Sequence, residues 1–86
     1  MTNYEIEFVK SAQRELHKLP QQTALRIAKA IYRLRADPRK GNVRPMVGVT
    51  SWRLRVGDYR VVYDILDSRC VILVIRVRHR KEVYRA

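Results

Sequence analysis

The chain has 86 residues, enough for one hydrophobic core but not two, because a chain this short buries only about 60% of its unfolded surface. Hydrophobic residues make up 47% of it, which excludes intrinsic disorder. The 19 Lys and Arg against 8 Asp and Glu give a net charge of +11, and a charge of this size indicates a polyanionic or acidic partner. We expect residues 1–86 to form a single basic domain.

The N-terminal segment has the period-two pattern of a strand with one buried face. Tyr4, Ile6 and Phe8 alternate with Glu5 and Glu7. The two glutamates also fall where a signal peptide needs apolar residues, and no segment reaches the ~20 apolar residues of a membrane span. We therefore expect a cytoplasmic protein with no membrane contact.

Two helices are predicted after this strand. Ala12, Leu16 and Leu19 fall on one helical stripe, and Pro20 interrupts the pattern where a second helix can begin. In the second helix apolar residues follow the i, i+3, i+4, i+7 spacing: Ala24, Ile27, Ala28, Ile31 and Leu34. We expect it to end near Asp37, because the residue before a proline avoids helical geometry.

The second half of the chain predicts a loop and three strands. Residues 39–50 contain two glycines and a proline without any sustained period, which indicates a connecting loop. Strands are expected at 52–56 and 59–66, joined by the tight turn Gly57-Asp58. A third strand is expected at 70–77, where an almost continuous apolar run is typical of a central strand covered on both faces. Cys70 is expected to be a buried residue that fills space in the core. The fold class is therefore α+β, in the order β-α-α-β-β-β, with a helical hairpin packed on one face of a small, mainly antiparallel sheet.

The turn fixes the register of the hairpin. With Gly57-Asp58 as the loop, Arg55 lies opposite Arg60, and the pleat places Arg53 on the same face. Like charges directly opposite destabilise a sheet by up to about 1 kcal/mol per pair. An anion-binding site and a merely solvated, screened face both fit these residues at this point.

The C-terminal residues favour the anion site. Arginines and lysine crowd the last eleven residues with Glu82 as the only acid: Arg76, Arg78, Arg80, Lys81 and Arg85. Tyr84 lies among them and could stack on an exposed base or simply pack the end of the chain. His79 borders this cluster and is a candidate proton carrier, since its ordinary pKa is near 6.5.

The sequence lacks the residues that other kinds of catalytic site require. The acids and the two histidines show no metal-ligand spacing, and Cys70 is alone, so neither a disulfide nor a thiolate metal site can form within the chain. A glycine-rich phosphate loop and a nucleophile elbow are also missing. We therefore expect no metal and no cofactor.

Three segments carry a resemblance to a known family: residues 11–20, residues 52–63 (WRLRVGDYRVVY) and residues 79–85 (HRKEVYR). Together with the order of elements they resemble the RelE/ParE toxin superfamily over nearly the whole chain. The resemblance implies the toxin of a type II toxin-antitoxin system, a ribosome-dependent ribonuclease that cuts mRNA in the decoding site and is neutralised by a cognate acidic antitoxin.

The family's functional positions fall on residues of this chain one by one. The basic pair of the first hairpin strand falls on Arg53 and Arg55, the second-strand arginine on Arg60, the arginine before the tail on Arg80, and the terminal aromatic on Tyr84. We predict four catalytic residues, Arg55, Arg60, Arg80 and Tyr84, and five RNA-binding residues, Arg53, Arg78, His79, Lys81 and Arg85. Many RelE toxins have lysines at the first pair, and arginine stays protonated and is a poor general base.

The expected reaction is attack of the RNA's own 2′-OH on the adjacent phosphate, with Arg55, Arg60 and Arg80 pointing into one shared region to hold its oxygens. Two alternatives stay open. One is a ParE-like toxin of the same fold that inhibits DNA gyrase without cleaving RNA, and the other is an RNA-binding module without catalysis.

Overall fold

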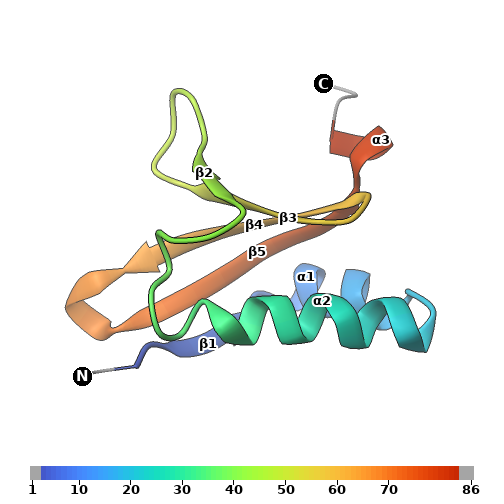
Figure 1. Ribbon diagram of the computed structural model, residues 1–86, viewed down its shortest axis with the longest axis horizontal. Helices are drawn as coiled ribbons and strands as arrows, with labels where there is room; N and C mark the ends of the chain where they lie inside the picture. The colour runs from blue at the N-terminus through green and yellow to red at the C-terminus, as the bar shows by residue number, and fades with distance from the viewer. Residues whose placement is uncertain (1–2, 84–86) are drawn as a thin grey trace.

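A five-stranded sheet with two helices on one face forms the molecule, in a computed structural model that describes residues 3–83 (Figure 1). The strands are β1 (Glu5–Phe8), β2 (Val43–Pro45), β3 (Trp52–Val56), β4 (Tyr59–Leu66) and β5 (Val71–His79), and the helices are α1 (Lys10–His17), α2 (Gln21–Arg33) and α3 (Arg80–Val83). The spatial order is β1-β5-β4-β3-β2, with β1 parallel to β5 and the other pairs antiparallel. The predicted α+β class and helical hairpin are confirmed.

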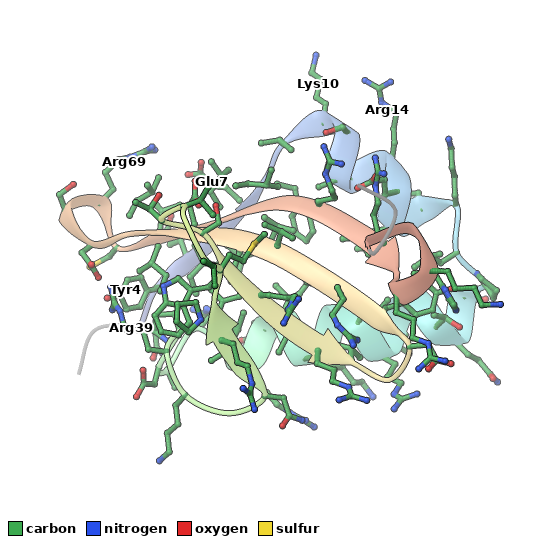
Figure 2. The ribbon with its side chains drawn as sticks, turned by 90° about the horizontal axis from the view of Figure 1, so that it is seen from above. Tyr4, Glu7, Lys10, Arg14, Arg39 and Arg69 are labelled. Carbon is green, nitrogen blue, oxygen red and sulfur yellow. The ribbon has the colours of Figure 1, made fainter. Side chains whose placement is uncertain are left out.

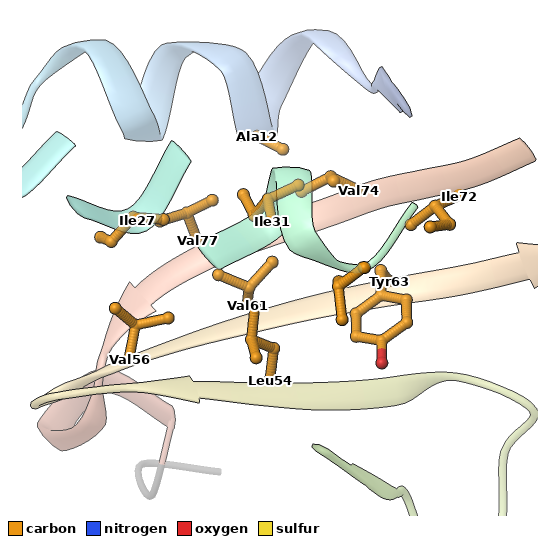
Figure 3. Close-up of a cluster of buried hydrophobic side chains, with 11 residues drawn as sticks. Ala12, Ile27, Ile31, Leu54, Val56, Val61, Tyr63, Ile72, Val74 and Val77 are labelled. Atoms are coloured by element: carbon orange, nitrogen blue, oxygen red, sulfur yellow. The ribbon is translucent and has the colours of Figure 1, made fainter. Parts of the chain in front are cut away.

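The two long helices lie where the apolar periodicity predicts them, although α2 ends at Arg33, four residues before the expected Asp37. Ala12 of α1 is completely buried against the sheet, and Pro20 stands at the N-cap of α2. On α2, Ile27 and Ile31 are buried and Leu34 follows at the C-cap. Figure 3 shows α1 and α2 on the same side of the strands, with Ala12, Ile27 and Ile31 facing the sheet. That side of the sheet is hereafter the helix face, and the opposite side is the open face.

One core joins the helices to all the long strands. Its buried members come from α1, α2, β3, β4 and β5: Ala12, Ile27, Ile31, Leu34, Leu54, Val56, Val61, Tyr63, Ile72, Val74 and Val77 (Figure 3). Tyr63 is fully buried, and its hydroxyl donates a 2.6 Å hydrogen bond to the carbonyl of Pro38. Burial raises the pKa of the Tyr63 phenol, so it stays a neutral donor that anchors the α2–β2 connection.

The hairpin register follows the prediction. Val56 pairs with Tyr59 and Arg55 with Arg60, so Gly57 and Asp58 are the two turn residues. Gly57 has φ +57° and Asp58 is not in the positive-φ region, as in a type II′ turn. This positive φ favours glycine, whereas the guanidinium of Arg26, 3.2 Å from where a Cβ would lie, belongs to an exposed side chain that can move away.

Two elements were missing from the predicted order. Residues 39–50, interpreted as a loop, contain the edge strand β2, which pairs with β3 and is only three residues long. The basic C-terminal segment begins a short helix, α3, which leaves the end of β5 on the side opposite α1 and α2 (Figure 1). Both elements border the open face.

The last strand also differs from the expectation of a strand that begins at Cys70 and is covered on both faces. Cys70 lies just before β5 with φ 51° and is only partly buried, after a 3-10 turn at Asp67–Arg69. Leu73 and Ile75 are partly exposed, so the strand is not covered on both faces. The register shifts between Val62 and Tyr63, which leaves Ile75 as an extra residue opposite that step.

Within residues 3–83, no helix has the length and apolar character needed to cross a membrane.

Candidate functional site

Arginines from four neighbouring strands gather on the open face. The strand registers place them there: Arg44 on β2, Arg53 and Arg55 on β3, Arg60 on β4, and Arg76 and Arg78 on β5. Arg55, Arg60 and Arg78 are directly opposite one another across three strands, and Arg44 is opposite Arg53. The same pleat that buries Val61 among the helices therefore presents a row of guanidinium groups on the other side.

Part of this face is hollowed. A concavity of about 610 Å³ is lined by backbone and side chains of β2, β3, β4 and the residues before β2: Gly41, Asn42, Val43, Arg44, Arg53, Arg55 and Arg60. Four of these seven residues are arginines, and no acid is among them. The shape and charge fit an extended anion, such as the backbone of a single-stranded nucleic acid.

Arg60 is the most unusual member of the group. Only 6% of its surface is exposed, and its Nη1 donates a 3.2 Å hydrogen bond to the carbonyl of Tyr59. Among the described side chains no carboxylate lies within 4.0 Å of Arg60, Arg55 or Arg53, or of the strand arginines Arg44 and Arg76. A buried guanidinium beside other cations is costly unless an anion compensates it. The arrangement is therefore suited to binding phosphate, which arginine contacts through two parallel hydrogen bonds.

The structure places two other predicted residues at the margin of this face. Arg78 donates through Nε to Glu15 Oε2 at 3.0 Å. Arg80, the first residue of α3, lies beside the hairpin turn, where its backbone N–H binds the carbonyl of Asp58 and its Nε is 4.0 Å from the Asp58 carboxylate. Arg80 does not line the concavity, so the expected convergence holds for Arg55 and Arg60 but not for Arg80.

His79 is on the opposite side from the one expected. It pairs with Tyr59, packs edge-on against that ring at 5.3 Å, and lines a small depression next to Leu19 on the helix face. Its Nδ1 accepts a hydrogen bond from the exposed Lys81 N–H at 3.3 Å. Arg78 lines the same depression, but His79 does not line the concavity that holds Arg55 and Arg60. Tyr84 and Arg85 lie outside the described residues.

Arg44 is a member of the concavity that the sequence did not indicate. It faces Arg53 across the β2–β3 pair. The only signal was one basic residue between Val43 and Pro45, and three residues are too few to show an alternation.

The described residues offer positive charge and hydrogen-bond donors. Between residues 3 and 83, no cluster of three or more His, Cys, Asp and Glu side chains is arranged to hold a metal ion. The arginines can bind and polarise a phosphate, but they are poor proton acceptors. Chemistry at this face would therefore act by orienting a phosphate and stabilising its charge.

Comparison with known proteins identifies relatives over almost the whole chain. Residues 6–84 match the family model described as the ParE toxin of the type II toxin-antitoxin system parDE. The toxin RelG of Mycobacterium tuberculosis is 35% identical, over 95% of this chain and 97% of that protein. The mRNA interferase toxin RelE of Escherichia coli is 32% identical, over 94% of this chain and 90% of that protein.

Solved structures share the fold. The toxin-antitoxin complex RelBE2 of Mycobacterium tuberculosis contains a chain that matches with a TM-score of 0.85 and 29% identity, covering 93% of this chain and 94% of that one. The archaeal RelE-RelB complex of Pyrococcus horikoshii matches with a TM-score of 0.79 and 28% identity over the full length of both chains.

Proposed function

The chain belongs to the RelE/ParE family of toxins from type II toxin-antitoxin systems, and from this premise we propose that it is a metal-independent endoribonuclease that cleaves mRNA. The relative in Escherichia coli is named an mRNA interferase, and the arginine-lined face suits an RNA phosphate. We take residues 1–86 as one toxin domain.

The observation that carries the proposal is the position of Arg60. It is buried at the centre of the open face, without a carboxylate within 4.0 Å among the described side chains, and Arg55 and Arg78 are its direct cross-strand neighbours. Guanidinium groups that have no carboxylate partner among the described side chains are costly to gather in a hollow, which favours a phosphate ligand for this site. A phosphodiester between them supplies the missing negative charge.

The proposed step needs no external reagent. The 2′-oxygen of the RNA attacks its own 3′-phosphate, the bond from phosphorus to the 5′-oxygen of the next nucleotide breaks, and the products are a 2′,3′-cyclic phosphate and a free 5′-OH. The proton of the 2′-OH leaves to a base and the departing 5′-oxygen gains one, so atoms and charge balance. The reaction gains most from in-line geometry and from stabilising the extra charge on the phosphate.

The residues divide this work by position. Arg55 and Arg60 hold the non-bridging oxygens, where one preorganised donor is worth ~10² or more in rate. Arg80, which lies outside the concavity beside the hairpin turn, is assigned to the RNA backbone next to this phosphate. Tyr84 stacks on a base to fix the attacking nucleotide. Proton transfer is assigned to Tyr84, since the arginines cannot easily accept a proton and His79 lies on the helix face, away from the concavity.

Further contacts extend along the strand of RNA. We assign them to the predicted binding residues and to the one found in the concavity: Arg53, Arg78, Lys81, Arg85 and Arg44. The mRNA would be presented in the ribosomal decoding site, which places the toxin in the cytoplasm. A site with few proton acceptors benefits from a ribosome that orients the substrate.

The inhibitory partner is proposed to be an acidic antitoxin. Several structural neighbours are complexes of RelE with RelB. A net charge of +11 favours an acidic segment, and the exposed apolar side chains Leu25 and Tyr32 on α2 offer a second surface for it. The entropy lost when such a segment becomes ordered would be offset by charge pairing and by burial of apolar surface.

Mapped cleavage of mRNA with and without ribosomes tests the proposal. We expect the parent protein to leave discrete cuts with 2′,3′-cyclic phosphate and 5′-OH ends when ribosomes are present. Arg60→Ala should lower the cleavage rate ~10²-fold or more, because a central phosphate donor is lost.

The matched control is Arg14→Ala, which removes the same charge from the exposed surface of α1, where Arg14 points to solvent (Figure 2). It should cleave like the parent. Equal cleavage by Arg60→Ala and the parent would reject the site. Growth arrest without any cuts, together with inhibited DNA gyrase, would replace the nuclease by the alternative toxin activity.

A further inference from the structure

Glu15 places a carboxylate against the end of the arginine row. Its Oε1 accepts the backbone N–H of Val77 at 2.9 Å, and its Oε2 accepts the Nε–H of Arg78 at 3.0 Å. Glu15 lies three residues after the buried Ala12, so it is on the side of α1 that faces β5. One side chain from the first helix therefore binds two consecutive residues that lie 62 and 63 positions further along the chain.

Glu15 lies beside the part of β5 that extends past the end of β1. β1 ends at Phe8, which is opposite Val74, whereas β5 continues to His79. Beyond Val74 no strand of the described residues pairs with this edge of β5, and the N–H of Val77 needs another acceptor. The side chains of Glu15 and Arg78 are only 24% and 34% exposed, so the contact is partly shielded from water and stronger than a surface ion pair.

The contact has a consequence for the site. Arg78 is the direct cross-strand neighbour of Arg60, and Glu15 is the acid that offsets this pair of like charges. Because Glu15 takes the Nε–H, the two Nη groups of Arg78 stay available to another acceptor; no hydrogen bond from them is found within residues 3–83. An arginine whose fork is already fixed loses less freedom when it binds phosphate.

We propose that Glu15 is a positioning residue for RNA cleavage: it fixes Arg78 at the margin of the open face so that the Nη groups meet the RNA phosphate. This role rests on the proposed function. Glu15 itself touches no substrate and acts through Arg78.

The test compares kcat and KM for ribosome-dependent mRNA cleavage in four proteins: the parent, Glu15→Gln, Arg78→Ala, and the variant with both changes. Glutamine can still accept the Val77 N–H through its single amide oxygen, but it then turns its NH2 group toward Arg78 and has no charge to pair with the guanidinium. We expect Glu15→Gln, made in the parent sequence, to lower kcat/KM about tenfold. This is less than the ~10²-fold loss that a misplaced catalytic group can cause. In the Arg78→Ala background the same change should have no effect.

The matched control is Glu7→Gln. Glu7 contacts Arg69 at 3.5 Å in an exposed pair away from the arginine row, and Figure 2 shows the two side chains near one another. Its cleavage should equal that of the parent. Hydrogen exchange of the Val77 amide provides a readout without activity: it should stay slow in Glu15→Gln and become fast in Glu15→Ala.

The outcomes separate the two proposals. A parent protein that cuts no mRNA removes the nuclease assignment and, with it, this role for Glu15. A parent protein that cuts mRNA while Glu15→Gln is fully active removes the positioning role alone. An equal loss from Glu15→Gln with and without Arg78 would show that Glu15 serves only the fold, and this also overturns the inference.

Discussion

The two faces of β4 differ in almost every property. On the helix face Val61 and Tyr63 are completely buried and belong to the core. On the open face Arg60, Val62 and Asp64 follow the same alternation, and Arg60 is buried with Arg55 and Arg78 as its direct cross-strand neighbours. The helix face therefore supplies most of the apolar burial that stabilises the fold, whereas the open face carries the positive charge that we propose to bind RNA.

The largest expected effect would come from the helix face. Ile31 is 1% exposed at the centre of the core, so Ile31→Ala should lower the free energy of unfolding by about 2–5 kcal/mol. Urea unfolding would measure it. The folded fraction should still cleave mRNA at the parent rate, because no open-face group moves. A loss of activity in fully folded protein would break the division between the two faces.

A substitution on the open face is expected to change the free energy of unfolding less, and in the opposite direction. Arg60→Met keeps an apolar stem but removes a cation flanked by Arg55 and Arg78. Relief of like-charge repulsion is worth up to about 1 kcal/mol per pair, so the variant should be as stable as the parent or slightly more stable in urea unfolding. A loss above about 2 kcal/mol would show that Arg60 has a structural partner and would contradict its assignment to a ligand.

Features set by neighbouring residues could be predicted from the sequence. The turn at Gly57 determines the β3–β4 register, and the pleat then assigns Arg53, Arg55 and Arg60 to one face. The helical stripe of α2 was equally readable, because its 13 residues give more than three turns of pattern.

Features that depend on distant contacts could not be predicted. β2 has three residues and α3 four, too few for a periodic pattern. The extra residue at Ile75 reverses the alternation along β5, so the apolar run gave no indication that His79 turns to the helix face. The bond from Arg78 to Glu15 joins residues 63 positions apart, and no local spacing encodes it.

The smallest expected effect lies at the end of the sheet where β4 turns into β5, on neither face. Asp67 accepts hydrogen bonds from Arg39 Nη2 and from the Tyr4 hydroxyl, both at 2.7 Å, and Figure 2 shows Tyr4 and Arg39 close together. Arg39 first and Tyr4 second hold the pKa of the Asp67 carboxyl below its usual value, while the bond to Asp67 raises the pKa of Tyr4.

The sign of the resulting pH dependence follows from that lowered pKa. Asp67 takes up a proton near its ordinary pKa of about 3.9 in the unfolded chain, but only at a lower pH in the folded chain. Its contribution to the free energy of unfolding is therefore complete above the ordinary pKa. The contribution is lost as the pH falls through the lowered pKa of the folded state. Asp67→Asn should therefore unfold at slightly lower urea than the parent at about pH 7, and the difference should shrink and then vanish as the pH falls below the ordinary pKa and through the lowered one. Because the cluster is exposed, the difference should stay small and shrink further in high salt. A gap that persists at acid pH would mean that Asp67 acts through packing instead of charge, and the end of the sheet would then belong with the helix face in its contribution to folding.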